Sequence, residues 1–146
     1  MSDAHDSLQV QEALTDAQIA GCWPVLAQLR THVPMEGFVA LVRRIESGGY
    51  RLAYIEDEGA VRAVAGWRIL DQLVRGRVLY VDDLVTDTTH RSKGYGDALL
   101  AWCHAKARAL ECSALELDSG THRHDAHRFY FRHRMTISSF HFVRPC

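Results

Sequence analysis

The segment from Val78 to Gly96 joins a strand-like apolar run to a helix that opens with glycine, and it constrains the fold more than any other stretch of the chain. The first turn of a helix has backbone N–H groups without intrahelical partners and carries the positive end of the helix dipole, so an anion is stabilised there. Gly94 and Gly96 allow a ligand to approach the backbone, and Arg91 and Lys93 add cationic side chains at the rim. The sequence therefore predicts a phosphate-binding loop between a strand and a helix.

Two common phosphate-binding motifs do not fit this junction. A Walker loop has four residues between its glycines, followed by Lys and then Ser or Thr, whereas here only Tyr95 separates Gly94 from Gly96. A Rossmann fingerprint requires a third glycine at the position that Leu99 occupies. The loop is therefore neither of these nucleotide-binding types.

The pattern that remains is Arg-x-x-Gly-x-Gly between a strand and a long amphipathic helix, and it resembles the acyl-coenzyme A site of the GNAT superfamily of N-acetyltransferases. The resemblance runs from Tyr80 to Met135, because Ala126 and Tyr130 have the spacing of the family's A-x-x-x-Y helix. It implies acetyl-CoA as cosubstrate, with the strand end before the loop offering backbone groups to the pantetheine arm. The residues implied in coenzyme binding are Leu84, Val85, Thr86, Arg91, Ser92, Lys93, Gly94, Tyr95 and Gly96.

A base is the next requirement of such a reaction, because an alkyl amine has a pKa near 10.4 and is almost entirely protonated at pH 7. Asp82 and Asp83 precede the strand end, and since successive strand residues face opposite sides, only one of them is expected to face the cleft. The resemblance assigns the catalytic role to Asp82, which matches the first acid of the pair in polyamine-type members, and turns Asp83 toward the core or the helix layer. Alternatively, both carboxylates are structural and pair with backbone or arginines.

Tyr130 is the second predicted catalytic residue. Coenzyme A leaves as a thiolate of pKa near 8.5, which a tyrosine hydroxyl can hydrogen-bond or protonate. The alternative for a Phe-Tyr-Phe run is core packing. The chain departs from the family pattern on either side of this tyrosine, with Arg123 where an Asn is usual and Arg134 where a Gly is usual.

Two further patterns suggest other functions. His122, His124 and His127 have a spacing that could be read as a metal site, but no Cys or acid completes a familiar zinc pattern, so we expect no metal. Arginines interleaved with phenylalanines near the C-terminus could suggest nucleic-acid binding, but the formal net charge of −1 gives no support for a nucleic acid or a membrane as partner.

The hydrophobic periodicity predicts an α/β fold of the GNAT-like mixed type, with a mostly antiparallel central sheet and helices on both faces. Thr15 is the expected N-cap of the first helix, which runs to about Arg30. The other expected helices span 34–46, 94–110 and 125–133, and the expected strands span 50–56, 61–70, 77–86, 114–117 and 137–143.

The chain length and composition fit one domain over residues 1–146, with residues 1–14 as a flexible N-terminal segment, because 47% hydrophobic content suffices for a single core. No apolar run reaches the roughly 20 residues that span a bilayer, and the N-terminus lacks the layout of a secretory signal, so we expect a cytoplasmic protein. Four cysteines without a C-x-x-C pair are expected to be reduced thiols.

Together these features predict an enzyme that moves an acetyl group from acetyl-CoA to a primary amine, by direct attack in a ternary complex. The acceptor is expected to be a small molecule or a peptide amine, and the acidic pair favours a cationic one. The alternative is a non-catalytic acyl-CoA-binding sensor or partner module. The acceptor's identity and the formation of a homodimer stay open at this stage.

Overall fold

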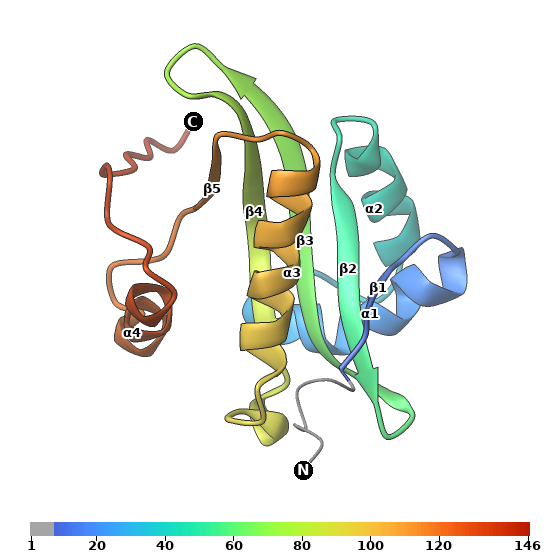
Figure 1. The fold of residues 1–146 in the computed structure, drawn as a ribbon. Helices are drawn as coiled ribbons and strands as arrows, with labels where there is room; N and C mark the ends of the chain where they lie inside the picture. The colour runs from blue at the N-terminus through green and yellow to red at the C-terminus, as the bar shows by residue number, and fades with distance from the viewer. Residues whose placement is uncertain (1–7) are drawn as a thin grey trace. The chain divides into compact units, whose positions relative to one another are not determined.

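The computed structural model describes residues 8–146, which form two compact units, one ending at Glu116 and one running from Leu117 to Cys146. Five strands form one sheet in the order β1-β2-β3-β4-β5 (Figure 1). The strands are β1 (Val10–Glu12), β2 (Arg51–Asp57), β3 (Ala60–Gln72), β4 (Gly76–Thr86) and β5 (Ala114–Leu117). The helices are α1 (Asp16–Leu29), α2 (Phe38–Glu46), the 3₁₀ helix η1 (Thr88–His90), α3 (Tyr95–Ala109) and α4 (His124–Arg132).

Each of the first four strands pairs antiparallel with the next, which confirms the predicted mostly antiparallel sheet. Within the first unit, α1 and α2 cover one face of the sheet and α3 covers the other (Figure 1). The side chains of neighbouring strand residues alternate between these two faces. Each face therefore has its own apolar layer, and a residue's parity along a strand decides which helices it meets.

The core on the α1 and α2 face unites residues that are distant in sequence. Ile19 and Cys22 of α1 pack with Leu52, Val64 and Val85 of the sheet. Each fully buried side chain of this size contributes about 1.5–3 kcal/mol relative to exposure. The opposite layer contains Leu99, Leu100 and Cys103 of α3, all buried, together with an edge-to-face contact between Trp67 and Trp102 at 5.9 Å.

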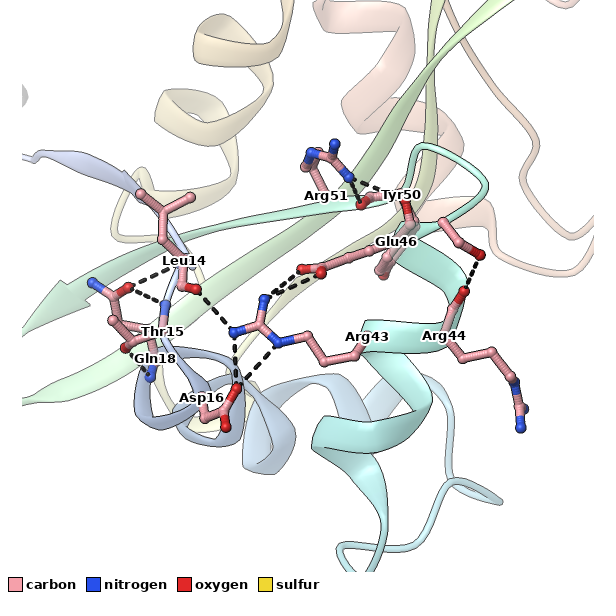
Figure 2. A network of polar contacts seen from close by, with 10 residues as sticks. Leu14, Thr15, Asp16, Gln18, Arg43, Arg44, Glu46, Tyr50 and Arg51 are labelled. Carbon is pink, nitrogen blue, oxygen red and sulfur yellow. Dashed lines mark hydrogen bonds and ion pairs between the residues drawn. The ribbon is translucent and has the colours of Figure 1, made fainter.

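Polar contacts fix the start of α1 and its position against α2. Thr15 caps the helix by accepting from the Gln18 amide at 3.2 Å, and the Gln18 side chain accepts from the Thr15 amide in return. Figure 2 shows Arg43 of α2 donating to Asp16 at 2.8 Å and to the Leu14 carbonyl at 3.0 Å. The predicted N-cap is thus confirmed, and the same turn receives a cross-link from the second helix.

A β-bulge interrupts the β3–β4 pairing. Gly66 lies opposite Asp83 and Trp67 lies opposite Val81, so no residue of the fully described strand β3 lies opposite Asp82. The extra residue on β4 locally disturbs the alternation of side chains between the two faces. Sequence reasoning expected strict alternation here, and the bulge makes that expectation wrong.

Most predicted elements are confirmed with ends shifted by a few residues, but three expectations differ from the structure. The second helix was expected from Pro34 and begins only at Phe38, because Gly37 holds a left-handed backbone with φ 78°. Residues 10–12 form β1 inside the segment expected to be flexible, while residues 1–7 lie outside the described residues.

The third difference concerns the predicted last strand, residues 137–143. Residues 135–146 contain neither helix nor strand, and Phe142 is 91% exposed. Alternating apolar residues supply the pattern of a strand, but a strand also needs a neighbour to pair with, and local sequence does not provide one. The prediction of a closing strand is therefore wrong.

The state of the cysteines and the lengths of the helices complete the description of the chain. Cys22, Cys103, Cys112 and Cys146 are all free thiols, as predicted, and the first two are buried. Within residues 8–146, no helix combines the length and apolarity that crossing a bilayer requires.

Candidate active site

The predicted phosphate loop follows β4 directly and is anchored at its start by Asp87. The Asp87 carboxylate accepts from the Gln28 side chain of α1 at 3.1 Å, and His90 Nδ1 lies 2.8 Å from its other oxygen. The Gln28 side chain in turn accepts from the Thr88 amide at 2.8 Å. These hydrogen bonds, the one from Gln28 first, lower the pKa of Asp87 to about 2. The chain is thereby held against α1 before the loop begins.

Tyr95 anchors the other end of the loop. Its side chain is buried, and its hydroxyl donates at 2.6 Å to Oδ2 of Asp57, the last residue of β2. This hydrogen bond is the largest cause that raises the pKa of Tyr95 to about 12. Tyr95 is among the residues predicted to bind the coenzyme. Its side chain bonds within the protein, so its backbone is the part that a ligand could contact.

Between the two anchors, the loop backbone exposes the start of α3. Ser92 and Gly94 have positive φ values of 65° and 83°, and Gly94 is the N-cap of α3 without a side-chain cap. Arg91 and Lys93, the residues before and after Ser92, are exposed. A helix N-terminus with open amides beside two cations suits a phosphate group. The residues of this loop therefore fit the pyrophosphate that sequence reasoning expected here.

The end of β4 contains the three residues predicted to meet the pantetheine arm. Leu84, Val85 and Thr86 pair with Ala65, Val64 and Ala63 of β3. The Val85 side chain is buried in the core, so its backbone is the part that a ligand could contact.

Asp82 and Asp83 join Arg30 and Arg68 in one group of charges, which we call the Arg–Asp cluster. Arg68 donates from Nε and Nη2 to the two carboxylate oxygens of Asp82 at 3.0 and 2.5 Å. Arg30, the C-cap of α1, donates to Asp83 Oδ1 at 2.7 Å and to the Asp82 carbonyl at 2.9 Å. The hydrogen bonds to Asp82 are the main reason that the pKa of Arg68 is raised. Both carboxylates are thus paired with arginine.

Tyr50 contacts both Asp83 and Arg68 of the cluster. Its ring is buried, its hydroxyl donates to Asp83 Oδ2 at 2.6 Å, and the Arg68 guanidinium lies 5.4 Å from the ring centre. Burial, followed by the charge of Asp83, raises the pKa of Tyr50 well above its ordinary value. A Cβ on Gly66 would lie 2.0 Å from the Tyr50 oxygen, so the ring occupies space that only glycine leaves open.

The bulge explains why both acids reach one cluster. Alternation would send Asp82 and Asp83 to opposite faces, but β4 has an extra residue here. The Asp82 carboxylate meets Arg68 of β3, and the Asp83 carboxylate meets Arg30, the C-cap of α1, and Tyr50, which directly precedes β2. Asp83 is 13% exposed and Asp82 is 24% exposed. Asp82 therefore has the greater access to a bound ligand.

Tyr130 lies in α4, within the second unit. Burial raises the pKa of Tyr130, and the nearby Arg123 guanidinium opposes that rise. The hydroxyl is therefore protonated at neutral pH and can act as a donor. Arg123, an expected departure from the family pattern, lies at the N-cap of this helix, and Arg134, the other departure, has a positive φ of 61° that a glycine would adopt without strain.

The histidines of the second unit make contacts within the protein. His127 Nε2 lies 2.8 Å from the Gly120 carbonyl, and the His124 and His127 rings contact each other edge to face. Across residues 8–146, no group of three or more potential ligands has the arrangement that could hold a metal ion.

Comparison with known proteins identifies the family of this chain. The sequence profile described as Acetyltransferase (GNAT) family matches residues 10–134. The chain is also 31% identical over 140 residues to the uncharacterized N-acetyltransferase YhdJ of Bacillus subtilis, covering 94% of this chain and 99% of that protein. This chain belongs to the GNAT acetyltransferase family.

Two further similarities extend this assignment. The aminoalkylphosphonate N-acetyltransferase of Salmonella typhimurium is 36% identical to this GNAT chain over 64 residues, which are 44% of this chain and 42% of that enzyme. A solved acetyltransferase of Trypanosoma brucei has the same fold, with a TM-score of 0.80 at 20% identity over 96% of this chain and 100% of the other. The family resemblance inferred from the sequence is confirmed, and so is the predicted fold class.

The residues that hold the predicted site of this GNAT chain in place could not be recognised from the sequence. Tyr50, Arg30 and Arg68 were not singled out, because their partners Asp82 and Asp83 lie 14 to 53 positions away in the sequence. One local signal was available, since an isolated glycine within a strand pattern indicates a bulge or a close approach, and Gly66 has both.

Proposed function

We propose that this GNAT chain is an acetyl-CoA-dependent N-acetyltransferase that acts on a primary amine by direct attack in a ternary complex. The observation that carries the proposal is the loop after β4, where the exposed cations Arg91 and Lys93 directly precede the start of α3, which has no side-chain cap. Ser92, Gly94, Tyr95 and Gly96 would offer backbone N–H groups to the pyrophosphate, and the backbone of Leu84, Val85 and Thr86 would orient the pantetheine arm.

Asp82 is the proposed base. Its carboxylate is the more exposed of the two and carries four lone-pair positions, of which Arg68 uses two. A proton from the acceptor can reach the others directly or through water. Arg68 would then hold the carboxylate in one orientation while the amine approaches.

Tyr130 is the proposed acid. As the amine nitrogen bonds to the thioester carbonyl carbon, the carbon–sulfur bond breaks and a thiolate leaves. The raised pKa of Tyr130 keeps its hydroxyl protonated, so it can donate to that sulfur. The ammonium form of the acceptor loses two protons in the full reaction: one ends on the thiol sulfur and the other passes to water through Asp82.

The acceptor is proposed to be an amine on a small molecule or a peptide. The Salmonella relative named for aminoalkylphosphonates supports a small acceptor. The pairing of Asp82 with Arg68 favours a second candidate, a non-catalytic acyl-CoA sensor, because an occupied carboxylate is less available as a base. Thiol release in the presence of amines separates the two candidates.

Calorimetric titration with acetyl-CoA tests the proposal. We expect binding by the wild type and its loss in Gly94→Glu, which places a negative charge at the start of α3. Gly37→Glu is the matched control, because Gly37 is also an uncapped helix N-cap with a left-handed backbone and has nothing within 4 Å of its missing Cβ. Loss of binding in both variants, or no binding by the wild type, would overturn the proposed loop function.

A further inference from the structure

The Arg–Asp cluster has no net charge. At neutral pH, Arg30 and Arg68 supply two positive charges, and Asp82 and Asp83 supply two negative charges. The ion pairs are close, at 2.7 Å for Arg30 with Asp83 and 2.5 Å for Arg68 with Asp82. The two acids therefore do not form the negative surface that the sequence suggested for a cationic amine.

The arginines also retain donors for a ligand. A guanidinium has five N–H groups, and the hydrogen bonds that Arg30 and Arg68 make to described residues in the cluster use Nε and Nη2 of each. Nη1 of each side chain lies outside these bonds. Arg30 is 46% exposed and Arg68 is 22% exposed, so Arg30 is the more accessible of the two.

Charge complementarity then selects the type of acceptor. In the cluster, each aspartate charge is already balanced by an arginine. The second ammonium group of a polyamine would therefore find no unpaired carboxylate there, and it would lie near two guanidiniums of the same sign. An amine that also carries an anion meets both signs: its nitrogen approaches Asp82, and its anion accepts from a guanidinium.

We propose that the acceptor is a small zwitterion, a primary amine that carries a carboxylate, phosphonate or phosphate group, and that Arg30 binds this anionic group. The inference rests on the proposed function, because it is the transfer reaction at Asp82 that brings the amine to the cluster. Tyr50 and the bulge at Asp82 hold the carboxylate of Asp82 and the guanidinium of Arg30 in the same cluster. The specificity of the enzyme would thus come from the partners of its acidic pair.

Acetyl-CoA-dependent thiol release with matched amines tests this inference. β-Alanine and 2-aminoethylphosphonate carry an anion two carbons from the amine, propylamine carries a methyl group at that place, and 1,3-diaminopropane carries a second ammonium. We expect kcat/KM for the two anionic amines to exceed that for propylamine and diaminopropane by roughly tenfold or more, the factor that one charge-assisted hydrogen bond provides.

Arg30→Gln tests the assigned residue. We expect a higher KM for the anionic amines. The ratio of kcat/KM for an anionic amine to kcat/KM for propylamine should fall toward one. Arg44→Gln is the matched control, because it removes an equal charge from an exposed position on α2 and should leave the ratio unchanged. Arg30→Lys, which keeps the charge but not the fork of donors, should give an intermediate ratio.

A measurement on the wild type covers the case in which Arg30→Gln fails to fold. Raising the NaCl concentration screens charge interactions at exposed sites, so it should lower kcat/KM for the anionic amines more than for propylamine. Equal salt effects on all four amines would contradict the inference.

The remaining outcomes separate this inference from the proposed function. Equal rates for all amines, a preference for diaminopropane or propylamine, or acceptance of lysine peptides alone would overturn the zwitterion inference. Binding of acetyl-CoA that depends on Gly94, without turnover of any of these amines, would also overturn it and leave the coenzyme loop standing. Absence of acetyl-CoA binding would overturn the proposed function itself.

Discussion

The ring of Tyr50 fills the space where a side chain on Gly66 would be, and this packing places the Tyr50 hydroxyl against Asp83 of the Arg–Asp cluster. A Cβ on Gly66 would lie 2.0 Å from the Tyr50 oxygen and 2.5 Å from Cζ. Gly66 is also the residue opposite Asp83, which accepts the hydrogen bond of the Tyr50 hydroxyl. The absence of a side chain at Gly66 on β3 thus allows Tyr50, which directly precedes β2, to orient Asp83 on β4.

Gly66→Ala is expected to destabilise the protein by about 1–3 kcal/mol or more, because the added methyl group overpacks a buried site. Chemical denaturation would measure the loss. Tyr50→Ala in the same chain should relieve most of the cost of Gly66→Ala, since it removes the atoms that clash. Gly21→Ala is the control: its Cβ would lie 3.9 Å from the nearest atom, and alanine within a helix should stabilise by about 0.5–1 kcal/mol. Additive costs for Gly66 and Tyr50 would contradict this contact.

Tyr50→Phe keeps the ring and removes the hydroxyl, so it isolates the hydrogen bond to Asp83. We expect a loss of about 1.5–3 kcal/mol in the free energy of unfolding, because the acceptor is charged and mostly buried. Tyr54→Phe is the matched change, since its hydroxyl bonds to the neutral Gln11 side chain at 2.9 Å, and its cost should be about 0.5–1.5 kcal/mol. If Tyr54→Phe lowers the free energy of unfolding as much as Tyr50→Phe does, the charge of Asp83 does not strengthen the hydrogen bond from Tyr50.

Asp82→Asn is expected to lower kcat roughly 10²-fold or more, the usual contribution of a general base, while the dissociation constant of acetyl-CoA changes little. Steady-state thiol release and calorimetry would measure the two quantities. Asp83→Asn is the comparison, because it removes the adjacent charge and weakens the contacts with Tyr50 and Arg30. It should act mainly on stability. A larger fall in kcat for Asp83→Asn would transfer the role of the base to Asp83.

Tyr130→Phe should lower kcat on the order of 10²-fold without a matching loss in acetyl-CoA affinity, because it removes the proposed donor to the thiolate and keeps the ring. The raised pKa of Tyr130 means that its hydroxyl stays protonated from pH 7 to 9, so the ratio of wild-type to variant kcat should be constant over that range. Phe129→Leu, beside it in α4, is the control for packing. A wild-type-like kcat in Tyr130→Phe would remove this residue from the mechanism.

Asp87→Asn tests the anchor of the phosphate loop through its pH dependence. The pKa of Asp87 falls from an ordinary 3.8 to about 2 in the folded protein. A lowered folded pKa means that the carboxylate stabilises the protein fully above about pH 4 and loses this effect as the pH falls through about 2. Wild type should therefore have a higher free energy of unfolding than Asp87→Asn at pH 7, and this difference should decrease between pH 4 and pH 2. Urea denaturation at several pH values would measure it; a constant gap would contradict the assignment.

Much of the fold could be predicted because its signals are local. The apolar spacing of α1 and α3, the cap at Thr15 and the turn before β3 depend on residues within a few positions of one another. The loop proposed to bind phosphate has signals of the same local kind, since its glycines, its cations and the helix that follows are contiguous. The last strand at 137–143 was predicted wrongly on the same kind of signal, because pairing requires a partner that the local pattern does not contain.

The sequence by itself determined the family, the order of the elements from α1 to α4, and the place of the loop that we propose to bind phosphate, since these follow from short-range spacing and from backbone conformations that glycine permits. Only the tertiary structure decided what surrounds the acidic pair. The bulge at Asp82, the arginines that neutralise both acids and the tyrosine over Gly66 depend on contacts between residues far apart in the chain. Charge pairing and steric exclusion act through space, so they appear only when the strands and helices are packed together.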